Sequence, residues 1–142
     1  MNDTAQLLNE LQQLVNTQSL PTLVPILPLL LRLDGRRFSL ENHYQFEPLF
    51  NTRTPKRIAI KAGRQVGKTQ SIAAHSVIQC ATIPYFKILH VTPLYEQVRR
   101  ISNNYIRPLI NQSPVRGLWV GPNTENSVLQ RSFVNFSTMF FS

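Results

Sequence analysis

Residues 62–69, AGRQVGKT, constrain the fold of this 142-residue chain more than any other segment. The preceding residues 56–62, KRIAIKA, alternate apolar and charged side chains as a strand does. In residues 68–81 the apolar side chains recur at helical spacing. A glycine-containing turn between a strand and a helix allows backbone N–H groups to face a phosphate, and the helix N-terminus adds its positive dipole end. The sequence therefore predicts a phosphate-binding loop over residues 62–69.

The residue types in this loop indicate particular roles. Gly67 allows close approach of the backbone, Lys68 is expected to neutralise the β and γ oxygens of ATP, and the Thr69 hydroxyl is expected to bind Mg²⁺. The full pattern has glycine at its first position, where this chain has Ala62. The alternative interpretation is a surface turn with a solvated lysine. The candidate nucleotide-binding residues are Ala62, Gly63, Arg64, Gln65, Val66, Gly67, Lys68 and Thr69.

The segments after the loop continue the alternation of strands and helices. Residues 86–91, FKILHV, predict a second strand, and residues 94–105 predict a helix with one apolar face. A turn is expected at residues 121–123, and residues 128–142 alternate as at the edge of a sheet. This order predicts an α/β fold of the P-loop NTPase type. We expect a mostly parallel sheet flanked by helices and incomplete at its C-terminal side.

The N-terminal part differs in character. Residues 4–15 predict a short amphipathic helix, and the apolar residues 20–33 are too short, and too often interrupted by proline, to cross a membrane. They are expected to run extended, as a linker or docking strap. We therefore divide the chain into residues 1–37, an N-terminal helix and proline-rich linker, and residues 38–142, a partial P-loop domain. Residues 38–50 precede the first predicted strand, where many P-loop ATPases hold the adenine ring.

Charge and the titratable residues limit the classes of function. The formal net charge of +8 favours polyanionic ligands such as DNA, RNA or nucleotides. Arg99, Arg100 and Arg107 are candidate DNA contacts, although a solvated helix face is the commoner explanation. Cys80 is the sole cysteine, which excludes an internal disulfide and indicates a buried thiol. The histidines at 43, 75 and 90 lack ligand partners at metal-binding spacing and are interpreted as structural.

On the residues GRQVGKT after KRIAIKA, the chain resembles the ATPase domain of the large terminase subunits of tailed phages. In that family the first loop position is often a small residue other than glycine, as Ala62 is, and the family's loop arginine falls on Arg64. The resemblance implies that Arg64 acts catalytically by contacting the γ-phosphate. Residues 88–110 are similar to the family's second strand and helix, and the resemblance covers roughly residue 38 to the C-terminus.

The resemblance implies an activity and a set of partners. The parent motor would hydrolyse ATP, with Mg²⁺, to move double-stranded DNA into an empty capsid. It would dock on the portal protein and act with the small terminase subunit, in the cytoplasm of the infected host cell and without a membrane. The family also carries an endonuclease domain.

The chain departs from the family in its acidic residues. No apolar run followed by Asp and Glu, the Walker B element, occurs after Val91, and the nuclease carboxylates are missing. Glu96 falls in a predicted helix and Glu125 in a polar turn. We therefore expect this chain alone to bind ATP without hydrolysing it at a motor's rate. The alternatives are a fragment of another P-loop translocase or helicase, and a non-catalytic basic fragment that binds nucleic acid.

Overall fold

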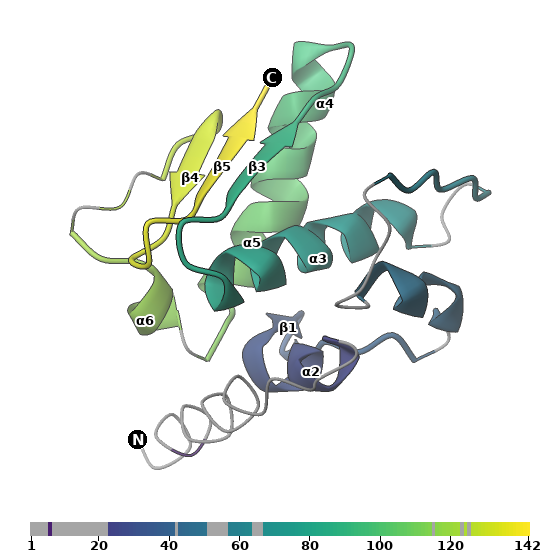
Figure 1. The fold of residues 1–142 in the computed structure, drawn as a ribbon, viewed down its shortest axis with the longest axis horizontal. Coiled ribbons are helices and arrows are strands. Elements are labelled where there is room, and N and C mark those ends of the chain that lie inside the picture. Colours follow the sequence, from purple (N-terminus) through teal and green to yellow (C-terminus); the bar gives the residue numbers. More distant parts are fainter. Residues whose placement is uncertain are drawn as a thin grey trace.

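The computed structural model describes residues 6, 23–41, 43–50, 57–63, 67–114, 116–122, 124 and 126–142, and these residues form an α/β structure (Figure 1). The short elements before the loop are the 3₁₀ helix η1 (Val24–Ile26), α2 (Leu27–Leu30), β1 (Arg32–Leu33), β2 (Arg36–Arg37) and the 3₁₀ helix η2 (Tyr44–Phe50). The elements after it are α3 (Lys68–Thr82), β3 (Lys87–His90), α4 (Tyr95–Arg100), the π-helical segment η3 (Ile101–Ile106), α5 (Arg107–Asn111), α6 (Arg116–Trp119), β4 (Gln130–Ser132) and β5 (Thr138–Phe141).

The larger sheet has the strand order β3-β5-β4. Strand β5 pairs in parallel with β3, Lys87 opposite Thr138, and antiparallel with β4, Gln130 opposite Phe140. The sheet is therefore small and mixed within the described residues, whereas the sequence predicted a mostly parallel one. Residues 128–142 were expected at a sheet edge, but β5 lies between two strands because β4 folds back beside it. The α/β class itself is confirmed.

The predicted helices and the second strand after the loop are present. Helix α3 covers the predicted residues 68–81, and β3 lies within residues 86–91. The helix predicted over residues 94–105 runs further, as the continuous rod α4–η3–α5, which lies behind the sheet in Figure 1. Pro108 lacks the N–H that a regular helix would donate to residue 104, and its ring crowds that carbonyl, which accounts for the wider π-helical turn before it.

The strand predicted over residues 56–62 is wrong for the part that the structure describes. Residues 57–63 have no regular secondary structure, and Ile58 is exposed while Ile60 is half-buried. A strand is stabilised by hydrogen bonds to a neighbouring strand, and no such pairing involves these residues within the described chain. Of their apolar side chains, Ile60 packs against the hydrophobic core, whereas Ile58 stays exposed.

The prediction that residues 20–33 run extended is also wrong where the structure describes them. Pro25 and Pro28 lie in the first turns of η1 and α2, where a missing N–H costs no hydrogen bond. The Ser113 hydroxyl donates to the Leu30 carbonyl at 2.6 Å and ties α2 to the end of α5. The fully buried side chains of this segment are Ile26, Leu27, Leu30 and Leu31. The segment therefore belongs to the core.

The sequence also predicted an N-terminal helix and no membrane-spanning segment. The helix predicted over residues 4–15 lies outside the described residues except for Gln6. Among the helices that the structure describes, none has the length and apolar character needed to span a membrane.

Candidate nucleotide-binding site

The start of α3 has the backbone geometry that a phosphate-binding loop needs. Gly67 is the N-cap residue with φ of 84° and ψ of 13°, a left-handed conformation that glycine adopts without strain. The first helical hydrogen bond runs from Ser71 N–H to the Gly67 carbonyl at 2.9 Å. No side chain among the described residues caps this terminus, and no acidic residue lies in the first turn. The terminus therefore keeps the positive end of a 15-residue helix directed at the loop.

The structure describes some of the predicted site residues and not others. Lys68 and Thr69 lie half-buried in the first turn of α3, immediately after Gly67. Ala62 is half-buried and Gly63 is exposed at the end of the irregular segment 57–63. Arg64, Gln65 and Val66 lie outside the described residues, so their expected contacts stay predictions.

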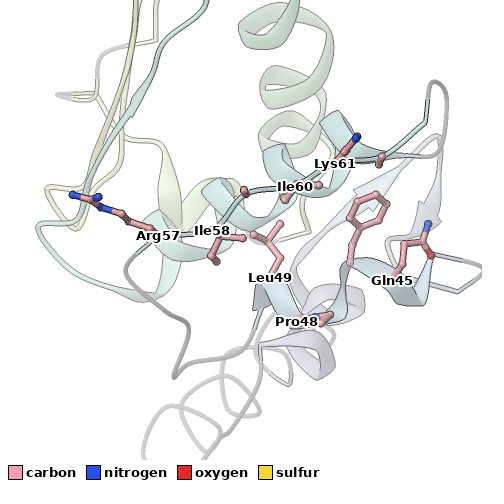
Figure 2. Close-up of a pocket in the computed structure, with 10 residues that line it drawn as sticks. Gln45, Pro48, Leu49, Arg57, Ile58, Ile60 and Lys61 are labelled. Carbon is pink, nitrogen blue, oxygen red and sulfur yellow. The ribbon is translucent and has the colours of Figure 1, made fainter.

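A cavity of about 540 Å³ lies beside the loop, between η2 and residues 57–62 (Figure 2). Its walls are mainly apolar, and Figure 2 shows Leu49 opposite Ile58 and Ile60, with Gln45 at one end. Arg57 extends away from the other labelled side chains. The residues that line the cavity are Gln45, Phe46, Pro48, Leu49, Arg57, Ile58, Ala59, Ile60, Lys61 and Ala62. An apolar slot with a terminal amide has the chemistry to hold a flat, partly polar ring.

A second, smaller cavity of about 270 Å³ touches the start of α3. His43 and Glu41 line it together with Gly67 and Gln70. The His43 ring lies directly on Gly67, because a β-carbon built on that glycine would be 2.8 Å from Cδ2 of the ring. The amide nitrogen of Gln70 is buried and has no hydrogen-bond partner within the described part of the chain. Sequence reasoning interpreted His43 as structural and gave no sign of this contact.

The carboxylates of the described residues lie mostly away from the loop. Glu96 is exposed in α4, with its Oε1 4.0 Å from Nη1 of Arg99. Glu41 lines the smaller cavity, but its side chain is exposed. No group of three potential metal ligands occurs among the described residues. Glu125, the other acid discussed above, lies outside them.

Burial determines the protonation of the interior histidines and of the cysteine. The His75 ring packs edge-on against Phe50, with centroids 5.3 Å apart, and burial lowers its pKa to about 4. His90 stacks on Phe141, and burial lowers its pKa as well. Burial raises the pKa of the Cys80 thiol to about 12, so this thiol is inert in the folded chain.

A buried arginine of β4 joins the antiparallel hairpin β4–β5 to the helical rod. The Arg131 guanidinium donates from Nε to Ser102 Oγ at 3.0 Å, from Nη2 to the Ser102 carbonyl and Asn103 Oδ1, both at 3.2 Å, and from Nη1 to Asn126 Oδ1. Burial, with a smaller contribution from the charge of Arg107, lowers the pKa of Arg131. The candidate DNA contacts Arg99, Arg100 and Arg107 are exposed on the same rod.

Comparisons with known proteins return no match: no protein-family model fits the chain, no curated protein is significantly similar to its sequence, and no solved structure is significantly similar to its fold. The features of this chain that point to a function are therefore the loop sequence, the start of α3 and the two cavities beside it.

Proposed function

We propose that this chain binds Mg-ATP through residues 62–69, as the nucleotide-binding part of a P-loop ATPase of the large terminase type. The observation that carries the proposal is the start of α3, where Gly67 has a positive φ and no described side chain caps the helix N-terminus, and where Lys68 and Thr69 follow at once. Free backbone donors and a lysine beside a helix dipole together form a site for polyphosphate.

The residues present fit the phosphates and the metal. Gly67 has no side chain to separate the backbone N–H groups from a phosphate, and Lys68 supplies a positive charge at the first turn. Thr69 supplies the hydroxyl oxygen that Mg²⁺ prefers. Bound Mg²⁺ would neutralise charge on the β and γ phosphate oxygens. In this proposal Arg64 contacts the γ-phosphate and acts in turnover by the parent motor.

The apolar cavity beside the loop supports a nucleotide over simple phosphate. It adjoins Ala62, the first residue of the loop, and Gln45 offers an amide that can both donate to and accept from a base. Residues 38–50 were expected near the adenine ring from their position in the sequence, and η2 forms one wall of this cavity. We propose that the cavity holds the adenine base.

We further propose that the parent protein packages double-stranded DNA, with the portal protein and the small terminase subunit as partners. This part rests on the resemblance of GRQVGKT and of residues 88–110. The net charge of +8 agrees with a polyanionic partner. That charge equally favours a second candidate, a basic fragment that binds nucleic acid without nucleotide.

Thermal unfolding in millimolar Mg-ATP separates the two candidates. Because a ligand that binds only the folded state adds about 2.7 kcal/mol at a hundred times its Kd, the melting temperature of the wild-type chain should rise by several degrees. Lys68→Ala should abolish this rise while leaving the unliganded melting temperature nearly unchanged. Lys87→Ala, which removes an exposed lysine of β3, is the matched control and should keep the rise. A folded wild-type chain whose melting temperature ignores Mg-ATP would favour the second candidate.

A further inference from the structure

We infer that His43 is a positioning residue that connects the base cavity to Gly67 at the start of α3, so that a base in the cavity fixes the backbone of Gly67 for phosphate binding. The inference rests on the proposed function, because it assumes that the cavity and the loop hold two parts of one ligand. It assigns to His43 a role that the loop motif does not contain.

The first link is the contact between His43 and Gly67. A β-carbon on Gly67 would lie 2.8 Å from Cδ2 and 3.1 Å from Nε2 of the ring, distances that only a glycine permits. The ring is held on its other side, where Nδ1 lies 3.2 Å from the Glu41 carbonyl oxygen. Since a carbonyl oxygen can only accept, Nδ1 carries the proton in this bond, and the opposite edge of the ring, with Cδ2 and Nε2, lies against Gly67. The position of the ring therefore restricts the backbone of Gly67.

The second link joins His43 to the cavity wall. The backbone N–H of Phe46 donates to the His43 carbonyl at 3.1 Å, and the His43 N–H donates to the Leu40 carbonyl at 2.7 Å. Phe46 is buried, and its side chain lines the 540 Å³ cavity. A ligand that displaces or fixes Phe46 therefore acts on His43 through one hydrogen bond of a short helical turn.

The opposite wall of the cavity reaches the loop directly. Residues 57–62 line the cavity and continue through Ala62 into Gly63. An occupant of the cavity thus acts on Ala62 and Gly63 through the chain and on Gly67 through His43. Fixing these residues lowers the conformational entropy that phosphate binding must still remove from them, which makes base and phosphate binding cooperative.

The test compares the affinities of Mg-ATP and of magnesium tripolyphosphate, which lacks a base, by titration calorimetry. The wild-type chain should bind ATP more tightly. His43→Ala should weaken ATP binding about tenfold, within the usual range of coupling between sites, and leave tripolyphosphate affinity within about twofold. The matched control is Tyr44→Ala, since Tyr44 is the next residue, is exposed and does not line this cavity. It should leave both affinities unchanged.

The possible outcomes separate this inference from the proposed function. Equal losses of both affinities in His43→Ala would place the histidine at the phosphates and overturn the coupling, and so would unchanged affinities. A wild-type chain that binds both ligands equally would keep the phosphate site and overturn the coupling. A wild-type chain that binds neither ligand would overturn both proposals.

Hydrogen exchange of the wild-type chain with adenosine alone gives a second measurement that needs no substitution. Adenosine at millimolar concentration should slow exchange of the backbone amides at residues 57–62, which line the cavity. If His43 transmits occupancy, the amides at residues 67–70 should also slow, by about fivefold, although no phosphate is present. Protection confined to residues 57–62, or protection of neither segment, would overturn the inference.

Discussion

Gly67 is constrained twice, by its backbone conformation and by the ring that lies on it. Its φ of 84° costs an L-residue about 1–2 kcal/mol, and an added methyl group would meet His43 at 2.8 Å. We predict that Gly67→Ala lowers the free energy of unfolding by about 2–4 kcal/mol, measured by urea denaturation. The control is Gly117→Ala in α6, where a β-carbon meets nothing within 4 Å and the change should be neutral or slightly stabilising.

The double variant His43→Ala/Gly67→Ala separates the two constraints on Gly67. Removing the ring should restore the part of the loss caused by the steric contact and leave the part caused by the positive φ. If the double variant is less stable than the sum of the two single changes predicts, the ring does not oppose a side chain at residue 67.

At this scale the sequence predicted the residues that carry the motif but not the one that touches them. Gly67, Lys68 and Thr69 follow a local pattern, and a local pattern places them together at the first turn of a helix. The contact of His43 with Gly67 depends on how η2 packs against α3, which no short-range spacing encodes. The residues that follow His43 in the sequence, Tyr44 and Gln45, form no motif that would have indicated this contact.

The π-helical segment η3 accepts hydrogen bonds from a side chain of β4, Arg131. The Arg107 N–H donates to the Ser102 carbonyl five residues earlier, and Arg131 donates to the same carbonyl. Desolvating the guanidinium is costly, but removing it leaves the buried Ser102 Oγ and the part-buried Asn103 Oδ1 without this donor. When the arginine is replaced by an apolar side chain, the cost of leaving these acceptors without a donor exceeds the desolvation cost that is saved.

We therefore predict that Arg131→Met lowers the free energy of unfolding by about 2–3 kcal/mol, measured by urea denaturation. Arg99→Met on the exposed part of the rod is the control, since its ion pair with Glu96 spans 4.0 Å between exposed side chains. That substitution should cost no more than about 0.5 kcal/mol. Similar losses of unfolding free energy in the two variants would mean that Arg131 does not stabilise the contact between the rod α4–η3–α5 and the hairpin β4–β5.

The elements differ in how far the sequence predicted them. Helix α3 carries several buried side chains and strand β3 alternates exposed with half-buried ones, so pattern and packing agree. Residues 57–63 have the pattern of a strand without a pairing partner, and pairing depends on the whole sheet. The β1–β2 hairpin was missed although Asp34 and Gly35, both with positive φ, are a typical signal for such a turn.

Two half-buried histidines, His75 and His90, make the stability of the molecule depend on pH. Burial lowers the pKa of His75 from 6.5 to about 4, so between these values the unfolded chain binds more protons than the folded chain. The contribution of His75 to the free energy of unfolding is therefore fully present above pH 6.5, and it is lost as the pH drops from 6.5 to 4. Allowing for the partial exposure of the ring, we expect a loss of about 1–2 kcal/mol from His75.

The measurement is urea denaturation at several pH values, on the wild-type chain and on His75→Phe, which keeps an aromatic contact with Phe50. The variant should show a shallower fall between pH 6.5 and 4. A residual slope of the same sign should remain, because burial also lowers the pKa of His90. An unchanged slope in His75→Phe would rule out His75 as a source of the pH dependence.

The central position of β5 has a consequence for the order in which the chain acquires its structure. Both β3 and β4 hydrogen-bond to β5 and not to each other, so neither has its partner until residues 138–141 have left the ribosome. Joining β3 to β5 closes a loop of about fifty residues, and the entropy of that closure is recovered only when the whole sheet forms. During synthesis α3 and the helical rod can therefore form early, whereas the sheet that they pack against is completed last.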